Sequence, residues 1–535
     1  MSLDKDRRQK SGQPELPLAG QGEALHRWRS DESTSAADGH QRSGSDDRLD
    51  MEAVVQRDNL LAALHRVQSN RGSPGVDGMT VEQLPSYLRA NWPRLKTELI
   101  AGSYRPKPVL RREIPKAGGG TRQLGIPTVL DRFIQQAILQ VLQPRFDATF
   151  SDHSYGFRPG RSAHMAVMAA KRFVTAGRTV VVDVDLEKFF DRVNHDVLMG
   201  KLAHRIEDRR LLGLIRRYLE AGVMADGVVI ERQEGSPQGG PLSPLLANVL
   251  LDEVDRELEQ RGHAFARYAD DLNVYVGSMR AGERVMRLLR KLFYRLRLRI
   301  NEAKSAVAPA RERKFLGFSF WRHRDDAKLR VAPQAIEKLK ERIRKLTLRT
   351  RGRSMATIVA ELREYLIGWR NYFGLAETPG VFRKLDQWVR HRLRAYQLHL
   401  WRHPRVVFDE LVRRGVFRSW ARLAANFATS WWRCSCSKAV SIALPARTFD
   451  ANGIAAIEHV TSTLRTAGCG PACPVVWQGT PTGVSYADRA RLLLRSAPRL
   501  GVWVKCGPGG EGEIAARSTT SGHLTRLEGG RHPDI

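Results

Sequence analysis

The sequence lacks any long apolar segment. No run of about 18 apolar residues occurs in the chain, and the first residues, Met1 to Arg8, form no apolar signal region. These absences argue against a transmembrane helix and a secretory leader. We therefore expect a soluble cytoplasmic protein with no membrane partner.

Cysteine is scarce. There are five cysteines, an odd number confined to the last fifth of the chain, which argues against a disulfide framework. They are Cys434, Cys436, Cys469, Cys473 and Cys506. Their spacings, Cys-x-Cys and Cys-x-x-x-Cys, are not the paired Cys-x-x-Cys of a structural zinc site, and the scattered His459 and His523 do not complete one. We expect neither disulfides nor zinc.

Acidic residues are outnumbered by basic ones. The chain has 57 Asp and Glu against 88 Lys and Arg, which gives a formal net charge of +31 and a pI near 10.6. Such an excess calls for a polyanionic partner, and nucleic acid is the first candidate. The length of 535 residues and a hydrophobic content of 42% predict several domains with a large buried core.

The pattern of apolar residues divides the first half of the chain. Residues 1–50 are rich in Ser, Asp, Gly, Gln and Arg, which predicts a disordered arm. An amphipathic pattern that starts at Met51 and breaks at the Gly-rich stretch 70–78 predicts a helix followed by a loop. Residues 104–127 are typical of a hairpin, and residues 129–143 return to helical spacing.

A long basic region follows Pro333. To about residue 423, apolar positions recur at helical spacing, with basic side chains on the other faces and aromatic residues between them. A solvated face is the ordinary explanation of such charge, but basic side chains beside aromatics also suit phosphate contact and base stacking. We expect nucleic-acid contacts from Arg344, Arg370, Arg390, Arg392 and Arg394. Past residue 457 the pattern weakens, which predicts a mostly unstructured tail.

Two adjacent carboxylates, Asp270 and Asp271, follow Arg267-Tyr268-Ala269. The alternating apolar and polar residues of Leu272–Val276 predict a strand, so the pair lies at the bend of a β-hairpin. Carboxylate oxygens are the hard ligands that Mg²⁺ prefers. An inert, solvated turn is the common alternative for an Asp-Asp pair, and only neighbouring motifs decide against it.

The apolar strand that ends at Asp185 is such a neighbour. Because side chains alternate along a strand, Asp183 and Asp185 point to the same face. An Asp that ends a strand is often only a helix cap or a turn former. If this strand lies beside the hairpin in one antiparallel sheet, Asp185 and Asp270 can hold two Mg²⁺ ions about 4 Å apart.

Two loops add further candidate site residues to these carboxylates. The stretch Gly235 to Pro244 is punctuated by Gly and Pro, holds Gln238 between them and leads into an apolar helix. A plain turn is the alternative explanation. Lys116 and Arg122 flank the Gly-rich turn of the 104–127 hairpin and carry the charge to clamp a triphosphate, although isolated basic residues in a hairpin would mean little.

Five motifs, in this order and spacing, resemble the reverse transcriptase blocks of bacterial group II intron-encoded proteins. They are Ser154–Ser162, Asp185–Asp191, Ser236–Gly240, Tyr268–Asp271 and Phe315–Phe318. Gly368–Phe373, Leu385–Leu393 and Trp432–Ser435 resemble the maturase (X) region of the same family, so the resemblance runs from about Met51 to Ile457. It implies an α+β right-hand polymerase with fingers, an antiparallel-sheet palm and a helical thumb.

The resemblance also implies a division into domains and a set of partners. The expected segments are a disordered arm at 1–50, an N-terminal extension at 51–100, fingers and palm at 101–325, a thumb or maturase domain at 326–400, a C-terminal nucleic-acid-binding region at 401–457 and a tail of unknown function at 458–535. The implied protein copies RNA into DNA and binds its own intron RNA to promote splicing and mobility. Its partners would be that intron RNA, an RNA template, a DNA primer, target DNA and deoxynucleoside triphosphates, while a homodimer stays open.

Carried over residue by residue, the resemblance assigns roles to single side chains. Asp185, Asp270 and Asp271 would be the catalytic aspartates that hold two Mg²⁺ ions, with the Leu186 carbonyl as a further ligand. The remaining assignments are Lys116 and Arg122 for the triphosphate, Phe190 for exclusion of a ribose 2′-hydroxyl, Gln238 for the templating pair, Lys304 as proton donor to pyrophosphate and Arg158 for nucleic-acid contact.

Departures from the family and alternative functions remain. Many relatives end in a Cys/His-rich endonuclease domain, whereas the cysteine spacing here predicts no DNA-cleaving domain, as in the branch that lacks one. A domesticated reverse transcriptase in defence or repair is a second possibility. A splicing-only RNA-binding factor with a vestigial polymerase site is a third, and the intact carboxylate set counts against it.

Overall fold

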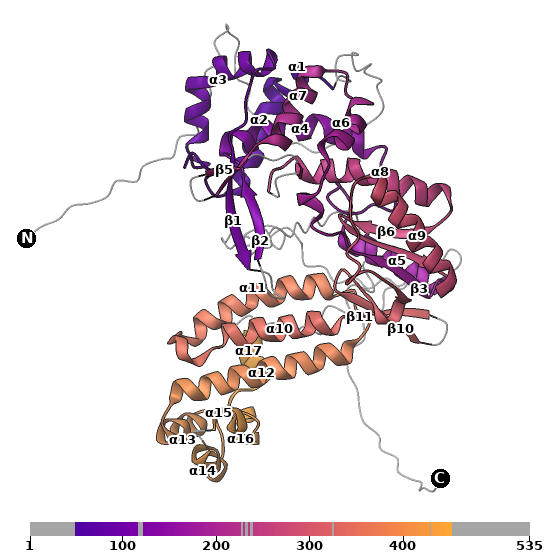
Figure 1. The fold of residues 1–535 in the computed structure, drawn as a ribbon. Helices are drawn as coiled ribbons and strands as arrows, with labels where there is room; N and C mark the ends of the chain where they lie inside the picture. The colour runs from indigo at the N-terminus through magenta and orange to yellow at the C-terminus, as the bar shows by residue number, and fades with distance from the viewer. Residues whose placement is uncertain are drawn as a thin grey trace, which may run out of the picture. The chain divides into compact units, whose positions relative to one another are not determined.

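A computed structural model describes residues 49–115, 121–225, 228–230, 234–235, 239–323, 326–427 and 430–451 (Figure 1). The predictions for the N-terminal arm and for the tail, including the absence of an endonuclease domain there, lie outside these residues. The chain divides into two units, Met1–Val475 and Val476–Ile535, and every described residue belongs to the first. Within the described part, no helix is both long and apolar enough to span a bilayer.

Helices and a small sheet form the first part of the described chain. The helices are α1 (Met51–Val54), α2 (Arg57–Asn70), α3 (Leu84–Ile100) and α4 (Val129–Asp147). Helix α2 ends where Arg71 adopts the left-handed conformation, at the predicted break, and it packs against α4. Buried apolar side chains such as Leu64, Val67 and Ile138 join the two helices, which confirms the predicted amphipathic pattern.

The predicted hairpin at 104–127 is confirmed. Strands β1 (Val109–Pro115) and β2 (Thr121–Ile126) pair antiparallel, from Leu110 opposite Ile126 to Pro115 opposite Thr121. Strand β4 (Val223–Ala225) runs parallel to β1 and pairs with β5 (Val228–Ile230), so the sheet has the order β2-β1-β4-β5.

A second antiparallel sheet carries the predicted carboxylates. Its order is β6-β7-β3-β8, with β3 (Val180–Val184), β6 (Ala264–Tyr268), β7 (Asp271–Val276) and β8 (Ala306–Pro309). The strand before Asp185 lies beside the hairpin that carries Asp270, which is the arrangement that the predicted metal site needs. We call this the palm sheet.

Both faces of the palm sheet are covered, which explains its apolar strands. Val182 and Val274 face a core shared with α8 (Ser243–Gln260) and α9 (Met279–Arg295). Val181 and Tyr275 face a second core with α5 (Ala163–Thr175). The remaining elements around the sheet are η1 (Phe189–Asp191), α6 (His195–Ala203), α7 (Arg209–Glu220) and η2 (Ala310–Glu312).

Long helices follow a third small sheet. Strands β9 (Lys314–Phe315), β10 (Phe318–His323) and β11 (Asp326–Val331) pair antiparallel in the order β11-β10-β9. The helices are α10 (Pro333–Leu346), α11 (Met355–Phe373) and α12 (Pro379–Trp401), with the short turn η3 (Arg349–Arg351) between the first two. They bury one apolar stripe each, including Leu339, Leu362 and Leu385, and their basic residues are exposed or partly buried.

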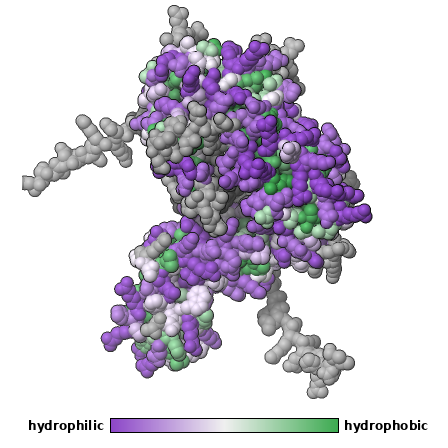
Figure 2. Space-filling view, viewed as in Figure 1, coloured by the Kyte–Doolittle hydropathy of each residue, from purple (hydrophilic) through white to green (hydrophobic). Residues whose placement is uncertain are grey.

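Five short helices complete the described chain. They are α13 (Pro404–Arg413), α14 (Arg418–Asn426), α15 (Trp431–Cys434), α16 (Lys438–Ala443) and α17 (Ala446–Ala451). Cys434 is buried and Cys436 is exposed, and both are free thiols, in line with the expected lack of disulfides at these two positions. The face shown in Figure 2 is predominantly hydrophilic, with only scattered apolar patches.

Candidate active site

The predicted carboxylates meet at one end of the palm sheet. Tyr268 and Asp271 close the β6–β7 hairpin as a pair, so Ala269 and Asp270 form its two-residue turn. On the other side of β7, Val184 lies opposite Leu272, and one step further the register brings Asp185 toward Asp271. Opposite residues in an antiparallel pair share a face, with Cβ atoms about 5 Å apart.

Negative charge accumulates on this face. The pKa of Asp271 is raised to about 8, by burial first and then by the carboxylates of Asp183, Asp270 and Asp185. Burial also raises the pKa of Asp183, although Arg313 opposes the shift. A raised carboxyl pKa means that burial and neighbouring negative charge disfavour the ionised form. The arrangement therefore favours binding of a cation.

Two basic side chains neutralise part of this charge. Lys304 Nζ lies 3.1 Å from Asp185 Oδ2, so the predicted proton donor and the predicted metal ligand are indeed brought together. Arg313 Nη2 lies 2.6 Å from Asp183 Oδ2. With its nitrogen turned toward β3, the Asn273 amide donates to Asp183 Oδ1 at 2.9 Å. Asp183 is thus held by protein groups, while Asp185 faces a single flexible lysine.

The backbone after Asp185 is fixed on both sides. The Asp185 N–H donates to Ser305 Oγ (3.0 Å), and the Asp185 carbonyl accepts from the Asn301 N–H (2.8 Å). Leu186 forms a bridge with Ile300, and its side chain is buried. These bonds tie the loop that carries Lys304 to the strand end that carries Asp185. The role of the Leu186 carbonyl as a ligand stays a prediction.

Asp185, Asp270 and Asp271 offer the oxygen ligands of a magnesium site, although they are not arranged as a complete metal-binding cluster. Among the described residues, no group of three or more His, Cys, Asp or Glu is arranged to hold a metal ion. Yet Asp185, Asp270 and Asp271 offer only hard oxygen donors, and burial with the neighbouring negative charge raises the Asp271 pKa. These residues fit Mg²⁺, which keeps several water or phosphate ligands of its own.

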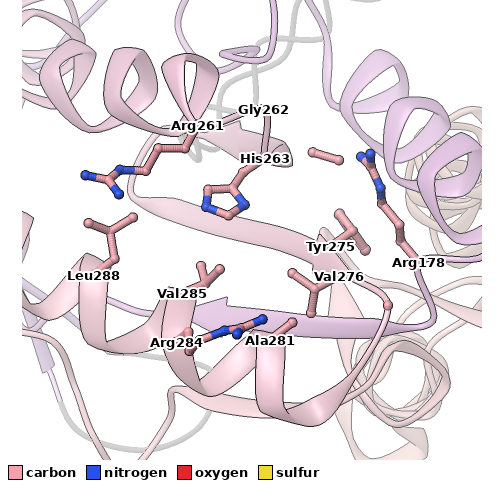
Figure 3. Close-up of a pocket in the computed structure, with 12 residues that line it drawn as sticks. Arg178, Arg261, Gly262, His263, Tyr275, Val276, Ala281, Arg284, Val285 and Leu288 are labelled. Carbon is pink, nitrogen blue, oxygen red and sulfur yellow. The ribbon is translucent and has the colours of Figure 1, made fainter.

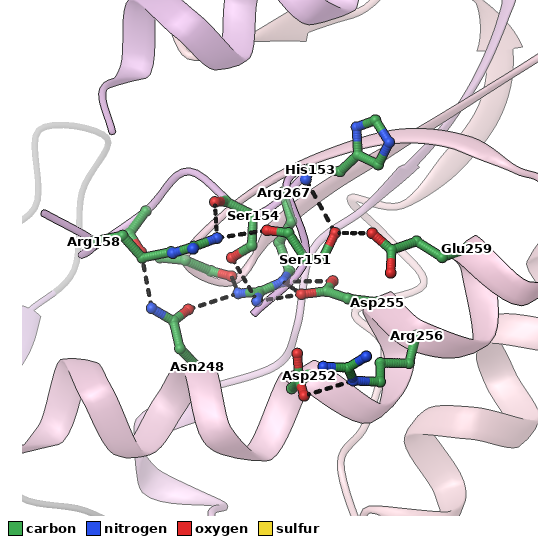
Figure 4. Close-up of polar contacts among 12 residues, drawn as sticks. Ser151, His153, Ser154, Arg158, Asn248, Asp252, Asp255, Arg256, Glu259 and Arg267 are labelled. Carbon is green, nitrogen blue, oxygen red and sulfur yellow. Dashed lines mark hydrogen bonds and ion pairs between the residues drawn. The ribbon is translucent and has the colours of Figure 1, made fainter. Parts of the chain in front are cut away.

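A buried arginine, Arg267, supports the Ala269–Asp270 turn (Figure 4). Arg267 is only 1% exposed, and its Nε donates to Asp255 Oδ1 on α8 at 2.8 Å. Its Nη1 donates to Asn248 Oδ1 and to the Ala269 carbonyl, both at 2.9 Å. Ala269 adopts a left-handed conformation, with φ of 60°, at this turn. The Arg267 bond to its carbonyl therefore fixes the strained residue directly before Asp270.

The same turn is held from its other side by a glycine. A Cβ atom on Gly156 would lie 2.2 Å from the Ala269 nitrogen, so no side chain fits there. The Gly156 carbonyl accepts from Asn248 Nδ2 at 2.9 Å, which links it to the network around Arg267. This close approach explains why the Ser154–Ser162 motif lies beside the Tyr268–Asp271 motif.

Arg158 is placed differently from its prediction (Figure 4). The residue is 9% exposed, and its guanidinium donates to Asp147 Oδ1 at 2.7 Å and to the Ser154 carbonyl at 3.0 Å. It also lies over the Phe150 ring, 5.5 Å from the centroid. Because its donors are used within the protein, Arg158 organises the 147–158 loop and is not positioned to contact nucleic acid.

Phe190 lies on the 3-10 turn η1, directly after the Asp185 strand end. Its ring is partly buried and meets Phe189 edge-on, with centroids 5.1 Å apart. Gly235 packs on this turn, since a Cβ there would lie 2.9 Å from the Asp191 oxygen and 3.0 Å from the Phe190 oxygen. The Gly235 N–H donates to the Val193 carbonyl at 2.8 Å. The loop that leads toward Gln238 is thereby anchored on the Phe190 turn.

Several predicted nucleotide contacts cannot be placed. Lys116 and Gln238 lie outside the described residues, and only the backbone of Arg122 is described, opposite Ile114 in the hairpin. Beyond Gln238, a Cβ on Gly239 would lie 2.4 Å from the Gly125 oxygen on β2. Gly239, the residue after Gln238, therefore lies against the same hairpin that carries Arg122.

The predicted basic residues of the long helices lie among aromatic rings. Arg344 and Arg392 flank Trp388, with their guanidinium carbons 5.8 and 5.7 Å from its ring centroid. Burial lowers the pKa of Arg392, and Arg349 and Arg344 lower it further, so positive charge is concentrated here. Arg392 also donates to Thr347 Oγ1 at 2.8 Å.

The other three predicted thumb arginines are partly buried. Arg394 donates to the Leu444 carbonyl at 2.9 Å. The Nε atom of Arg370 is buried without a hydrogen-bond partner among the described residues, and Arg390 is half-buried on α12. Nucleic-acid contact by this group stays a prediction.

The residues that support the Ala269–Asp270 turn were not among those predicted from the sequence. Arg267 and Asp255 form a fully buried ion pair, and Arg313 holds Asp183. A signal was available for the first pair, because each residue places a charge of opposite sign on an otherwise apolar face, one of a strand and one of a helix. No local pattern marks Arg313.

Comparisons with known proteins agree with the motifs. Residues 114–320 match the family model for "Reverse transcriptase (RNA-dependent DNA polymerase)", and residues 336–415 match "Group II intron, maturase-specific domain". Protein YkfC of Escherichia coli (strain K12) is 39% identical over 214 residues, which are 39% of this chain and 56% of that protein. Group II intron-encoded protein LtrA of Lactococcus lactis subsp. cremoris is 34% identical over 215 residues, 40% of this chain and 36% of that protein.

These matches cover only part of each relative. The aligned region spans about half the length of Protein YkfC and about a third of the length of LtrA. The mixed α+β architecture, with an antiparallel palm sheet followed by long helices, is the predicted fold class. Residues 114–320 are thus similar to reverse transcriptases and residues 336–415 to group II intron maturase-specific domains, in the order that the resemblance to group II intron-encoded proteins predicted.

Proposed function

We propose that the protein is an RNA-directed DNA polymerase that also binds a group II intron RNA and promotes its splicing and mobility. One observation supports the catalytic part most strongly. Asp185, Asp270 and Asp271 converge at one end of the palm sheet, where burial and then repulsion from neighbouring carboxylates raise the pKa of Asp271 to about 8. A protein maintains such repulsion where a cation is part of its working state.

The proposed chemistry assigns Asp185, Asp270 and Asp271 to hold Mg²⁺, with the Leu186 carbonyl as a further ligand. When bound as a pair, the ions would activate the primer 3′-hydroxyl and stabilise the charge on the leaving pyrophosphate. Lys304, whose Nζ lies 3.1 Å from Asp185 Oδ2, would give up this contact to Mg²⁺ and turn its proton toward the pyrophosphate.

The remaining predicted residues would position the nucleotide. Lys116 and Arg122 would hold the triphosphate, and Gln238 would contact the templating pair. Phe190 would lie against the sugar of the nucleotide, because its partly buried ring packs on Phe189 and the backbone of its turn packs on Gly235. An aromatic ring at that point leaves no room for a 2′-hydroxyl.

The maturase part of the proposal rests on the second family match and on charge. Residues 336–415 match a group II intron maturase-specific domain, and Arg344 of α10 and Arg392 of α12 flank Trp388. The formal net charge of +31 suits an RNA partner, and the same surface would hold an RNA template, a DNA primer and target DNA. Fingers and palm at 101–325 and a thumb at 326–400 remain our proposed domain limits.

Primer extension with isosteric variants tests the polymerase. Asp270→Asn and Asp271→Asn should each lower extension on an RNA template by about 10³-fold or more, because several kcal/mol of charge stabilisation is lost. RNA affinity should change little. Asp196→Asn serves as the control, since this aspartate lies on the exposed side of α6 in an ion pair with Arg216. Joint loss of extension and RNA binding would point to a structural role and contradict the proposal.

A splicing assay separates the two activities. Single-turnover splicing of the host intron should proceed with the Asp270→Asn protein at close to the normal rate, because RNA binding and not nucleotide transfer promotes it. If splicing also fails while RNA binding persists, the maturase proposal is wrong in its present form.

A further inference from the structure

A cavity of about 440 Å³ lies at the end of the palm sheet remote from the carboxylates (Figure 3). Its wall is formed by the start of β6, the end of β7 and one side of α9. Val276, Val285 and Leu288 supply an apolar surface. The volume lies in the range of pockets that enclose small organic ligands. A ligand that fills this cavity therefore needs an apolar or planar part.

The rim of the cavity is basic. Arg178, Arg261, Arg284 and His263 line it, and none of its twelve lining residues is acidic. Figure 3 shows the His263 ring among the three arginines. Burial lowers the pKa of His263, and Arg261 and Arg178 lower it further, as expected where positive charges converge. A ligand that fits this rim carries negative charge.

The arginines differ in how strongly they are held. Arg261 is fixed by Glu257, whose carboxylate lies 2.6 Å from its Nη2. Arg178 lies over the Phe173 ring at 6.0 Å. Neither Arg178 nor Arg284 forms an ion pair with an acid in the described part of the chain. Their guanidinium groups are therefore available for an anion.

The charge of the cavity continues along α9. Arg280, Arg284, Arg287 and Lys291 follow one another at intervals of four, three and four residues, which places them on one exposed stripe of the helix. We call these four residues the α9 stripe. Arg284 belongs both to the stripe and to the rim of the cavity. Glu283 lies beside the stripe but forms no ion pair with it among the described residues.

The other basic residues of α9 provide a contrast. Arg290 pairs with Glu302 at 2.8 Å, and Arg295 pairs with Glu253 at 3.8 Å. The stripe ends at Tyr294, three residues beyond Lys291, and this tyrosine is 83% exposed. An aromatic ring so exposed has little packing of its own, and it offers a face on which a base can stack.

We propose that the cavity and the α9 stripe form one binding track for a single-stranded nucleic acid, separate from the catalytic end of the palm sheet. Phosphates contact the stripe, one unpaired nucleotide enters the cavity, and another base stacks on Tyr294. The stripe and Tyr294 span about 21 Å along the helix, enough for several nucleotides.

Two features favour a single strand over other polyanions. Stacking on Tyr294 requires an unpaired base, because the bases of a duplex are covered by their neighbours. The cavity adjoins Arg284 and combines an apolar wall with a basic rim, which matches a nucleotide better than an acidic peptide. A duplex or an acidic protein segment would use the charge of the stripe without the cavity.

The track does not depend on the proposed catalysis. Its cavity lies near Val276, whereas the carboxylates lie near Asp271, about 17 Å away along the same strand. A variant can therefore lose nucleic-acid binding at the track without losing primer extension at the carboxylates, and the reverse.

Photo-cross-linking with position mapping tests the track. The full-length chain is saturated with an unlabelled primer–template duplex, and a short RNA that contains 4-thiouridine is then cross-linked and the labelled peptide identified by mass spectrometry. We expect label on Tyr294 or on its neighbours in α9. A DNA strand with 4-thiothymidine forms the second arm and shows whether RNA or DNA is preferred.

Variants of α9 supply the matched comparison. Arg284→Gln with Arg287→Gln should reduce the α9 label about tenfold, because two phosphate contacts are lost. Arg290→Gln with Arg295→Gln removes the same charge from the same helix but from arginines already paired with acids, and it should leave the label intact. Tyr294→Ala should weaken binding at the track about fivefold or more through lost stacking.

The outcomes are decisive either way. No label on α9, an equal loss in both double variants, or label that a duplex competes away as well as a single strand would overturn the proposal. Primer extension is measured on each variant in parallel. Normal extension with a lost α9 label separates the track from the polymerase, whereas a lack of extension by the unsubstituted protein with a retained label would count against the proposed function alone. Equal unfolding temperatures of the two double variants confirm that both fold.

Discussion

The two ends of the palm sheet carry opposite charges. At one end, Asp185, Asp270 and Asp271 converge, and burial together with the neighbouring carboxylates raises the pKa of Asp271 to about 8. At the other end, arginines surround a cavity, and burial together with Arg261 and Arg178 lowers the pKa of His263. Both ends thus accumulate charge of one sign without full compensation from the protein. The acidic end suits a cation and the basic end suits an anion.

The two ends also differ in how their arginines are used. Arg267 at the acidic end is buried with Asp255 and fixes the turn before Asp270. Arg261 and Arg284 at the basic end are exposed, and they add little to the packing of the fold. One end therefore uses arginine to build a rigid framework, and the other presents it to a partner.

The largest expected effect tests this difference in stability. Arg267→Met leaves the buried carboxylate of Asp255 without its partner, and it should lower the free energy of unfolding by about 3–5 kcal/mol. Arg261→Met breaks an exposed ion pair with Glu257 and should lower it by about 1 kcal/mol or less. Urea denaturation of both variants measures the contrast. Similar losses would show that the two arginines play the same structural role.

A second prediction concerns the pH dependence of the acidic end. Because the folded pKa of Asp271, about 8, exceeds the unfolded value of about 3.9, the folded protein holds a proton that the unfolded chain releases. Its stabilising contribution is therefore complete below about pH 4 and disappears as the pH rises toward 8.

Metal-free protein in EDTA should accordingly lose stability between pH 5 and pH 8 relative to the Asp271→Asn variant, which cannot titrate. Urea midpoints at several pH values measure this difference. Added Mg²⁺ should remove most of it, because the ion favours the ionised carboxylate. Parallel pH profiles for the two proteins would show that Asp271 is ionised throughout.

The smallest expected effect lies at the basic end. Arg284→Gln should change the free energy of unfolding by no more than about 0.5 kcal/mol, since the side chain is exposed and unpaired among the described residues. Extension of a primer already annealed to its template should also be unchanged. A marked loss of extension would mean that the two ends of the sheet are coupled and do not act separately.

Local patterns in the sequence were enough to locate the acidic end. Side-chain alternation placed Asp183 and Asp185 on one face, and the hairpin signal placed Asp270 and Asp271 at a bend, and the sheet order confirms both. The strong periodicity of α2, α4 and α10 was likewise visible in the sequence. These features depend on neighbours within a few residues.

Contacts between distant segments were not predictable in this way. Arg158 lies in a motif that suggested nucleic-acid contact, yet Asp147 and two backbone carbonyls take up its donors. Arg313 reaches Asp183 across 130 positions of sequence. Only the folded arrangement of the strands brings such residues together, so a single sequence contains no local sign of them.

The close packing of Gly235 on the Phe190 turn has a consequence for protein engineering. The two segments share backbone contacts and leave no space for a Cβ atom between them. A substitution that moves the backbone of the Phe190 turn would therefore also move Gly235. Libraries intended to alter nucleotide choice should vary both segments together and keep Gly235 constant.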